Sequence, residues 1–580
     1  MKYPSINNKH FLDLITQEFQ QFKIPKKQLT MEDICQPKKF KLQKSQEFVA
    51  EYLSPKSPYK SLLVFHQIGS GKTCTAVTVA EKWVGKRQII VLTPASLIDN
   101  FKDELRSLCA DDTYISNKDR QLLKSLSPKD KQYKDIILKS NKIIDKFYKI
   151  MSYHKFTNLA LDKKINFKNT LLIIDEVQNM VSISGTFYRV LSSMINKAPE
   201  DLRIMLLSAT PMFDSPTEIA LTINLLRPNK PLPIGNQFID KYIDIQKTPS
   251  GKLSYSTKNM DDFRNRITGY ISYYRGAPPQ AYPQVEIKVV RSKMLEFQYK
   301  SYLGAISENI SHIKGVFTSQ DISDISTDFM IGPRMLSNIA FPNKKTGFDG
   351  LRSLKGEALL LDNLKNYSIK FYKIIKKIKQ SKGPCFIYSN FKEEGGIESL
   401  IQILKFHGWK DYRKHGTGIK RYAVWSGDEN ITIKDQIKKT FNNYNNKNGS
   451  QLQLILGSPS IKEGVTLLRV EQVHIIEPYW NMSRILQIIG RAVRYCSHKD
   501  LPKNRRFVKI YLHIATLNND IKIKHKVDTT IDEHIWKIAN KKDIIIKQFE
   551  TALKERAVDC KLFYNLNNFD TDEQQLKCFK

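Results

Sequence analysis

The sequence predicts an α/β protein with two parallel-sheet domains, an inserted module of mixed or helical structure and a C-terminal helix. Short runs of apolar, β-branched residues alternate with segments of helical periodicity from about residue 37 onward. Strands buried on both faces have this continuous apolar character, which is typical of parallel sheets. The first group of runs comprises residues 61–65, 88–93, 170–175 and 203–208. The second group comprises 384–389, 421–427, 452–458, 473–478 and 508–516, so the rhythm occurs twice.

These two groups set the domain boundaries. Between them, proline-rich breaks and the lack of a comparable strand pattern favour an inserted mixed or helical module. Apolar residues at helical spacing from Ile531 to Leu553 predict a long amphipathic helix near the end. In order, we expect an N-terminal extension, a first α/β domain, the inserted module, a second α/β domain and a helical extension: 1–36, 37–228, 229–354, 355–520 and 521–580.

The composition is that of a folded protein with a strong excess of positive charge. Of 580 residues, 93 are Lys or Arg and 58 are Asp or Glu, a formal net charge of +35. Such a surface would bind a polyanion, either nucleic acid or an anionic membrane surface. The chain is also rich in Ile and Asn beside Lys, as an AT-rich coding sequence would be, so the charge alone is equally compatible with compositional bias. In the basic stretch 111–149 we expect helices and a surface loop, whose lysines form a solvated face rather than a dedicated binding patch.

No segment of the sequence has the pattern of a membrane span or a secretion signal. The amino terminus lacks an apolar core, and the longest apolar runs, such as 171–174, are far shorter than the roughly 20 residues that a span needs. The seven cysteines form no C-x-x-C pair, and their odd number favours reduced thiols over a disulfide framework. We therefore expect a cytoplasmic protein without a membrane partner.

A glycine-rich run follows the first predicted strand and precedes a predicted helix. Its residues are His66, Gln67, Ile68, Gly69, Ser70, Gly71, Lys72 and Thr73. Glycines let backbone N–H groups approach phosphates, and the amino end of a helix adds partial positive charge. Lys72 is expected to reach the β- and γ-phosphate oxygens, and Thr73 to bind Mg²⁺. The strict pattern has glycine where His66 stands, but the remainder is specific enough to assign the whole run to nucleotide binding.

An acidic pair, Asp175 and Glu176, ends the third predicted strand. At the carboxyl end of a buried strand an Asp can hold Mg²⁺, and the adjacent Glu can orient the attacking water. A solvated acidic pair would look the same by itself. After a phosphate-binding loop, however, the pair supplies the other half of an NTP-hydrolysing site.

The second α/β domain contains two arginines three residues apart, Arg491 and Arg494, after Gln487. This spacing predicts that both lie on one face of a helix. From there they could reach a γ-phosphate and stabilise the charge that develops during phosphoryl transfer.

In this order, these elements resemble the superfamily 2 helicases and translocases, which contain two RecA-like domains. Residues 175–178 (DEVQ) stand in place of a DEAH-type box, and 207–211 match motif III, which links hydrolysis to movement on nucleic acid in that family. Gln46 lies where the family has a glutamine that recognises adenine. Thr93 and Pro94 match motif Ia, which touches the nucleic-acid backbone.

The resemblance implies ATP and Mg²⁺ as cofactors, bound between the two RecA-like domains. It places Lys72, Asp175, Glu176, Gln178, Arg491 and Arg494 among the catalytic residues. It also assigns Gln46, Gly464 of motif V and Gln487 to nucleotide binding, beside the glycine-rich run.

Over residues 37–565 the chain is similar to the helicases of large cytoplasmic DNA viruses. These include the small subunit of the poxvirus early transcription factor and the poxvirus nucleoside triphosphatase I, which are related to Swi/Snf-type DNA translocases. The resemblance implies an ATP-dependent translocase on nucleic acid, with DNA favoured over RNA, acting in early viral transcription in the host cytoplasm or the virion. RNA polymerase or a transcription factor subunit would then be a partner. The alternatives are an RNA helicase acting on transcripts and a non-hydrolysing nucleic-acid clamp or virion component.

Several other residues have chemistry that the interpretation does not use. We expect His66, His474 and His498 to be packed or hydrogen-bonded, because an ATPase of this type needs no histidine base. Tyr479 and Trp480 could stack on a base, but core packing is favoured. Cys496 is expected to be a buried thiol.

Overall fold

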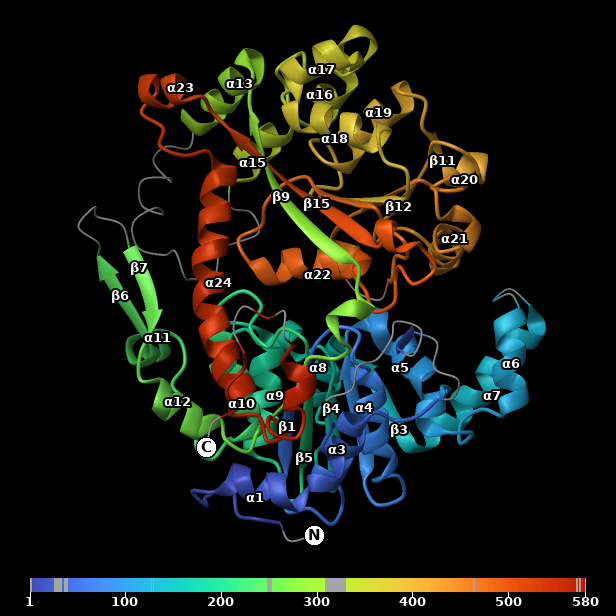
Figure 1. Ribbon diagram of the computed structural model, residues 1–580, viewed down its shortest axis with the longest axis vertical. Helices are drawn as coiled ribbons and strands as arrows, with labels where there is room; N and C mark the ends of the chain where they lie inside the picture. Colours follow the sequence, from blue (N-terminus) through green and yellow to red (C-terminus); the bar gives the residue numbers. More distant parts are fainter. Residues whose placement is uncertain are drawn as a thin grey trace. The chain divides into compact units, whose positions relative to one another are not determined.

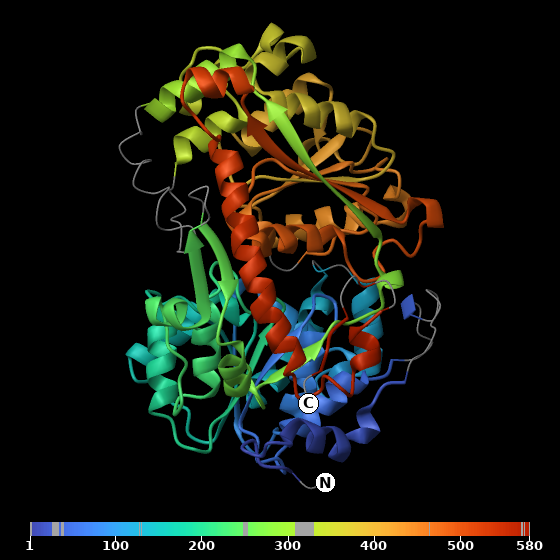
Figure 2. The same ribbon diagram turned by 60° about the vertical axis from the view of Figure 1, so that its left-hand side comes forward.

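The chain forms two units, each built on one parallel sheet (Figures 1 and 2). In this computed structural model, unit 1 comprises Met1–Pro279 and Ile544–Lys580, and unit 2 comprises Gln280–Asp543. The described residues are 3–25, 34–35, 40–126, 128, 130–247, 253–307, 330–462, 465–569, 572 and 575–578. The predicted class, two parallel-sheet α/β domains, is confirmed.

The sheet of unit 1 has six strands in the order β3-β2-β4-β5-β1-β8, and every neighbouring pair is parallel. The strands are β1 (Ser61–His66), β2 (Gln88–Thr93), β3 (Tyr148–Ser152), β4 (Thr170–Ile174), β5 (Arg203–Ser208) and β8 (Ile271–Tyr274). The central strands are buried on both faces, which explains their continuous apolar sequences.

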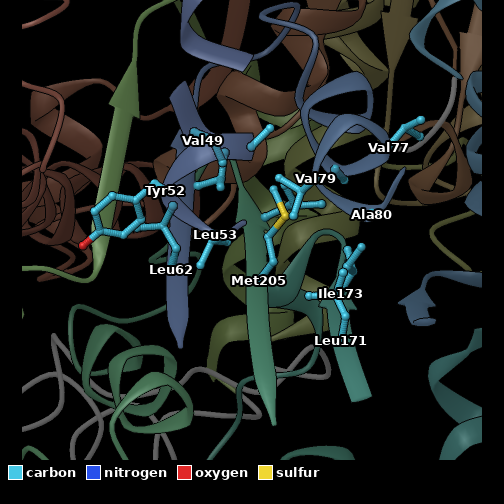
Figure 3. Packing of buried hydrophobic residues seen from close by; sticks show 14 of the residues in the cluster. Val49, Tyr52, Leu53, Leu62, Val77, Val79, Ala80, Leu171, Ile173 and Met205 are labelled. Atoms are coloured by element: carbon cyan, nitrogen blue, oxygen red, sulfur yellow. The ribbon is translucent and has the colours of Figure 1, made fainter. Parts of the chain in front are cut away.

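Helices cover the sheet of unit 1 and close its core. They include α1 (Phe11–Glu18), α3 (Lys44–Tyr52), α4 (Lys72–Glu81), α5 (Ile98–Leu105), α6 (Asn117–Ser125), α7 (Lys131–Phe147), α8 (Tyr153–Leu161), α9 (Thr186–Asn196) and α10 (Glu218–Leu226). Figure 3 shows one side of the core, where Val49 and Tyr52 of α3 and Val79 of α4 pack with Met205 of β5 and Ile173 of β4. This packing fixes α4, the helix after the glycine-rich run, against the sheet.

Smaller elements complete unit 1. An antiparallel hairpin, β6 (Ile243–Lys247) with β7 (Leu253–Thr257), lies between α11 (Asn236–Tyr242) and α12 (Met260–Ile267) in the sequence. The carboxyl half of α24 (Ile531–Glu555) and α25 (Tyr564–Asn567) also belong to unit 1. The long amphipathic helix predicted from Ile531 to Leu553 is confirmed as α24.

The sheet of unit 2 has seven strands in the order β11-β12-β13-β10-β14-β15-β9, again all parallel. They are β9 (Gln284–Lys293), β10 (Cys385–Tyr388), β11 (Lys410–Asp411), β12 (Arg421–Trp425), β13 (Leu454–Gly457), β14 (Gln472–Ile475) and β15 (Phe507–Thr516). Its helices include α13 (Glu296–Ser307), α15 (Ile331–Asn338), α16 (Gly347–Ser353), α17 (Leu361–Tyr367), α18 (Ile369–Lys379), α19 (Ile397–Phe406), α21 (Ile431–Phe441), α22 (Met482–Ala492) and α23 (Asn519–Lys524).

Six strands of the described chain were not foreseen, namely β3, β6, β7, β8, β9 and β11, and two of them change the domain division. β8 and β9 lie in the expected inserted module, 229–354, but β8 joins the sheet of unit 1 and β9 that of unit 2. Residues 229–279 therefore belong to unit 1 and 280–354 to unit 2, so the described part of this region forms no third module. β8 has only four residues, and β9 is an exposed edge strand with alternating charges, so neither shows the apolar run of a buried strand. β3 follows directly on the basic helix α7.

The cysteines differ from the expectation of reduced thiols. Disulfides join Cys74 to Cys109 and Cys560 to Cys578, across sequence separations of 35 and 18 residues that follow no spacing rule. Cys496, expected as a thiol, is disulfide-bonded as well. Cys385 is a free thiol, and burial raises its pKa to about 12. Cysteine usage therefore gives no support to the cytoplasmic assignment. Among the described residues, no helix is both long and apolar enough to cross a membrane.

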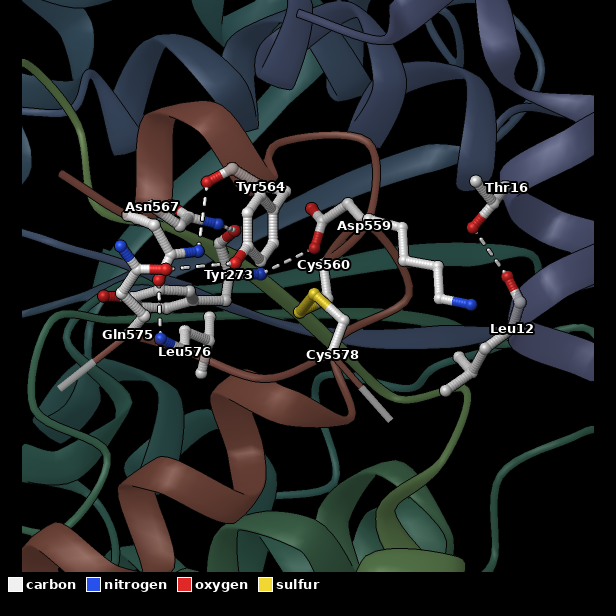
Figure 4. The surroundings of a disulfide bond; sticks show 12 residues. Leu12, Thr16, Tyr273, Asp559, Cys560, Tyr564, Asn567, Gln575, Leu576 and Cys578 are labelled. Carbon is white, nitrogen blue, oxygen red and sulfur yellow. Dashed lines mark hydrogen bonds between the residues drawn. A yellow bond between two sulfur atoms is a disulfide. The ribbon is translucent and has the colours of Figure 1, made fainter. Parts of the chain in front are cut away.

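A buried hydrogen-bond chain attaches the C-terminal segment to β8; Figure 4 shows its bond between Asp559 and Tyr273. Asp559 accepts a hydrogen bond from the backbone N–H of Tyr273 at 2.9 Å and another from the hydroxyl of Ser272. His66 Nε2 lies 3.0 Å from the same Ser272 Oγ. Which of these two atoms is the donor depends on the tautomer of the His66 ring. Its pKa is lowered to about 3 by burial, with a smaller effect of the charge of Lys72.

In the Asp559→Asn variant, the stability of unit 1 should depend less on pH than in wild type. Burial raises the pKa of Asp559 to about 7, against about 3.9 for an unfolded Asp. Between these values the folded chain holds a proton that the unfolded chain releases, so stability is highest below about pH 4 and is lost as the pH rises to 7. As the pH rises through that window, the free energy of unfolding of the variant should increase relative to that of wild type by up to about 1.4 kcal/mol per pH unit. Thermal unfolding of both proteins from pH 5 to pH 8 measures this; a difference that stays constant with pH would contradict it.

Candidate nucleotide site

The glycine-rich run forms a tight loop between β1 and α4. Gly69 and Gly71 have φ values of +83° and +79°, which glycine adopts without the penalty that a Cβ brings. Gly71 is the N-cap of α4, and its carbonyl accepts hydrogen bonds from Thr75. The loop thus directs the first N–H groups of α4 away from the helix, as a phosphate site requires.

Gln46 holds this loop from the amino-terminal side. Its Nε2 donates to the carbonyl of Gly71 at 3.3 Å, and its Oε1 accepts from the backbone N–H of Gln43 at 2.8 Å. A Cβ at Gly71 would lie 2.7 Å from Gln46 Nε2. Gln46 is therefore beside the loop, as expected, but both ends of its amide contact the backbone. Its contact with adenine stays a prediction.

The other loop residues divide into structural and accessible groups. His66 is completely buried and bonded to Ser272, which confirms that its side chain is packed and hydrogen-bonded. Its part in nucleotide binding stays a prediction. The backbone N–H of Gln67 donates to Tyr274, which ties the loop to β8. Ser70 is 2% exposed, and its Oγ has no hydrogen-bond partner among the described residues. Ile68, Lys72 and Thr73 are partly exposed.

The acidic pair stands at the carboxyl end of β4. Asp175 is 6% exposed, and its Oδ1 accepts a hydrogen bond from the backbone N–H of Glu176 at 3.0 Å. Glu176 has φ +53°, in the left-handed region, an uncommon conformation for a residue with a side chain. Tyr153 donates to the carbonyl oxygens of both residues. The strained turn is thus held by a buried tyrosine.

The loop and the acidic pair fit ATP with Mg²⁺. β5 lies between β4 and β1, so the strand that precedes Asp175 and the strand that precedes the glycine-rich loop are two strand spacings, about 10 Å, apart. A carboxylate and a hydroxyl are the oxygen ligands that Mg²⁺ prefers. The loop supplies glycines that leave room for phosphates and an unpaired buried hydroxyl, Ser70 Oγ.

A chain of side-chain hydrogen bonds leads from Glu176 to the next strand. Gln178 Nε2 donates to Glu176 Oε2 at 2.6 Å, and Ser208 Oγ donates to Gln178 Oε1 at 2.7 Å. The backbone N–H of Thr210 donates to Ser208 Oγ at 3.0 Å. The sequence named all four residues but could not pair them, because β4 and β5 are joined by a long connection that includes α9. The chain physically joins the DEVQ box to motif III.

In unit 2 the two arginines do not share one helical face. Arg491 lies on α22, is 9% exposed, and contacts the carbonyls of Gln487 at 3.3 Å and Val465 at 3.4 Å. The helix ends at Ala492, since Val493 has φ −90° and ψ 81°. Arg494 therefore stands in the following turn, partly exposed. The predicted pairing on one helix face is wrong, because the helix ends between the two arginines.

Other predicted residues of unit 2 have structural roles. Tyr479 and Trp480 are 6% and 2% exposed and stack on each other, which confirms core packing. His474 bonds to His513, and burial lowers the pKa of His474 to about 3. His498 bonds to a backbone carbonyl, as expected for a packed histidine. Gly464 lies outside the described residues.

Comparison of the chain with known protein families and proteins agrees with a nucleotide site here. The model of DEAD/DEAH box helicases matches residues 44–219, and that of the helicase conserved C-terminal domain matches 369–496. A protein of Acanthamoeba polyphaga mimivirus that is named as an ATP-dependent RNA helicase is 47% identical over 100% of this chain and 99% of its own length. A helicase of Invertebrate iridescent virus 3 is 28% identical over 89% of this chain and 53% of its own length. A termination factor NPH-I homolog of African swine fever virus is 24% identical over 86% of this chain and 76% of its own length.

The matched segments contain the site. The first includes the glycine-rich loop, the acidic pair and Ser208, and the second includes α22 with Gln487 and Arg491. The chain therefore belongs to the DEAD/DEAH box helicases of superfamily 2 and is an ATP-dependent helicase, an enzyme whose ATP hydrolysis depends on nucleic acid.

Proposed function

We propose that the chain uses ATP hydrolysis to move along duplex DNA during viral transcription. The observation that carries the proposal is the hydrogen-bond chain from Glu176 through Gln178 and Ser208 to Thr210. When ATP is hydrolysed, a change at the Glu176 carboxylate would alter its hydrogen bond to Gln178. Through Gln178 and Ser208 this change would reach motif III. Coupling between sites requires an element with two discrete arrangements, and in this proposal the hydrogen-bond chain is that element.

Each residue of the nucleotide site has a role that follows from the chemistry of its side chain. Lys72 and the N–H groups at the start of α4 hold the phosphate oxygens, and Thr73 and Asp175 hold Mg²⁺, which neutralises charge on the phosphates when bound. Glu176 orients the attacking water, and Gln178 fixes the position of Glu176.

The residues of unit 2 act on the same reaction. Arg494, the accessible arginine, stabilises the charge spread over the transferred phosphoryl group, whereas buried Arg491 positions the segment around Val465. Gly464 and Gln487 serve nucleotide binding in this proposal.

The relatives point to two kinds of nucleic acid. The name of the African swine fever virus protein, a termination factor homolog, supports a role in transcription, with RNA polymerase or a transcription factor subunit as the partner. The mimivirus relatives carry the name RNA helicase, which favours a second candidate, an RNA helicase acting on transcripts. The net charge of +35 suits either, because phosphate contacts read no sequence.

ATP turnover separates the two candidates. The full chain is assayed alone and with duplex DNA, single-stranded DNA and RNA of one sequence. The strongest stimulation by duplex DNA supports the proposal, and the strongest stimulation by RNA supports the second candidate. Equal stimulation by all three nucleic acids would contradict the proposal that the enzyme moves along duplex DNA.

Ser208→Ala should uncouple hydrolysis from movement. The variant loses the hydroxyl that joins Gln178 to the N–H of Thr210 but keeps the loop and the acidic pair. Nucleic-acid-stimulated turnover should fall by less than about threefold, while displacement of a third strand from a DNA triplex should fall by about tenfold or more, as expected from a coupling of about 1–2 kcal/mol. Ser193→Ala, at an exposed position on α9, is the matched control. Parallel losses of turnover and displacement would contradict a coupling role.

A further inference from the structure

The amino-terminal edge of the unit 1 sheet is strongly basic, although the ATP site lies at the opposite edge. Lysines cluster in the segments that precede the strands, and the exposed ones without an ion-pair partner among the described residues include Lys86, Lys146, Lys163, Lys168, Lys197 and Lys230. Lys149, at the start of β3, joins them; its Nζ donates to the side-chain oxygen of Gln88 at 3.2 Å. This set, with Lys149, is called the amino edge below.

The acidic residues at the amino edge are already engaged. Glu200 pairs with Lys60 at 3.1 Å, Asp162 with Lys164 at 3.0 Å, and Asp145 with Lys102 at 2.9 Å. Within the described parts of the chain, the remaining lysines thus have no carboxylate to neutralise them, and their charge faces solvent.

A general excess of lysine does not explain this edge. The segments that follow the same strands contain Asp175, Glu176 and Asp214 beside Lys72 and Lys155, a nearly balanced set. Within one sheet, positive charge is therefore concentrated at one end of the strands. Compositional bias would distribute it over both ends.

Two cavities lie along the amino edge. One of about 340 Å³ lies at the starts of β2, β3 and β4, and its lining includes Lys86, Arg87, Asp145, Lys146, Phe147 and Lys149. The other, of about 610 Å³, lies at the starts of β5 and β1, where Arg227, Lys230 and Tyr270 are among its lining residues. At about 4.8 Å per strand, the six strands span about 24 Å, room for several consecutive phosphates.

Aromatic side chains are interleaved with the charges. Phe147 is 40% exposed among the lysines of the first cavity, and the guanidinium of Arg227 lies 5.8 Å from the ring centroid of Tyr270 in the second. A basic groove with exposed aromatic rings binds single strands, because unpaired bases can stack on the rings. Acidic protein segments would use the charge but not an exposed ring.

We propose that the amino edge is a second binding surface, for single-stranded nucleic acid, separate from the ATP-coupled one. It would hold a strand that the enzyme has separated or the transcript that it approaches. The lysines of 111–149 are then part of a binding surface, not a solvated face alone.

Charge reversal tests the surface against a matched control. The triple variant Lys86→Glu, Lys146→Glu, Lys149→Glu is compared with Lys124→Glu, Lys131→Glu, Lys134→Glu, exposed lysines of α6 and the far end of α7. Binding of a labelled deoxythymidine oligomer is measured by anisotropy over a salt series. The first variant should lose about tenfold in affinity, and its salt slope should fall by about 2, at roughly 0.7 per phosphate contact. Equal affinities of the two variants, with unfolding temperatures like wild type, would overturn the proposal.

Two further measurements identify the occupant. Phe147→Ala should weaken oligomer binding by roughly five- to hundredfold, and Phe147→Trp should restore it. Photo-cross-links from a thiouridine-containing oligomer should map to the segments around Lys86 and Phe147. Displacement of the oligomer by polyglutamate as efficiently as by nucleic acid would instead assign the surface to acidic protein segments and overturn our choice.

These outcomes are independent of the proposed function. If wild-type ATP turnover responded equally to every nucleic acid, the proposal of movement along duplex DNA would be wrong. The difference in oligomer affinity between the two triple variants would still support the second surface. If the Lys86, Lys146 and Lys149 variant bound the oligomer as tightly as its control, the amino edge would not be a binding surface, whatever the turnover assay showed.

Discussion

Glu176→Gln should lower ATP turnover by roughly 10²- to 10⁴-fold, the usual contribution of a positioned general base, while ATP still binds. The change removes the negative charge that orients the water but keeps an oxygen that can accept the hydrogen bond from Gln178 at Oε2. The loop that holds the phosphates and the carboxylate of Asp175 are untouched. Binding and chemistry should therefore separate in this variant.

The measurement pairs turnover with binding. ATP affinity is followed by a fluorescent ATP analogue, and turnover by phosphate release with saturating nucleic acid. Glu200→Gln, an exposed glutamate of the same unit paired with Lys60, is the matched control and should behave as wild type. Near wild-type turnover in folded Glu176→Gln would show that another group orients the water.

The sequence predicted those parts of the fold that are buried and continuous. The strands of both sheet centres are buried over their whole length and mostly apolar, so their positions follow from burial, and β2 and β5 match the predicted ranges. β9 has exposed side chains at Val285, Ile287 and Val289 and charged neighbours. Its place in the sheet depends on its ladder with β15, a pairing between residues more than 200 positions apart that no local pattern encodes.

The candidate site shows the same division. Lys72, Thr73, Asp175 and Glu176 were predictable, because phosphate and metal chemistry restricts residue type at those positions. What could not be predicted is which side chains touch. The bond of Ser208 to Gln178 depends on β4 and β5 being adjacent, and the burial of His66 depends on Ser272 of β8. The Cys74–Cys109 disulfide likewise depends on how α4 packs on the segment after α5.

The left-handed glycines of unit 1 allow a direct test of the phosphate loop. Gly71 and Gly85 have nearly the same φ, +79° and +75°, so an alanine at either should cost a similar backbone strain of about 1–2 kcal/mol. They differ in their surroundings. A Cβ at Gly71 would approach Gln46 Nε2 to 2.7 Å, whereas at Gly85 nothing lies within 4 Å.

Gly71→Ala should therefore lose ATP binding and hydrolysis, while Gly85→Ala should lose only stability. At Gly71 either the loop or Gln46 must move by several tenths of an ångström, and the carbonyl that Gln46 and Thr75 share moves with them. Displacement of a reacting group by about 1 Å costs on the order of 100-fold in rate, so turnover without nucleic acid should fall by about that factor. Thermal unfolding and ATP turnover of both variants distinguish the two effects. Equal turnover in Gly71→Ala and Gly85→Ala would mean that the loop tolerates a side chain beside the phosphates, and the assignment of 66–73 as the phosphate site would be wrong.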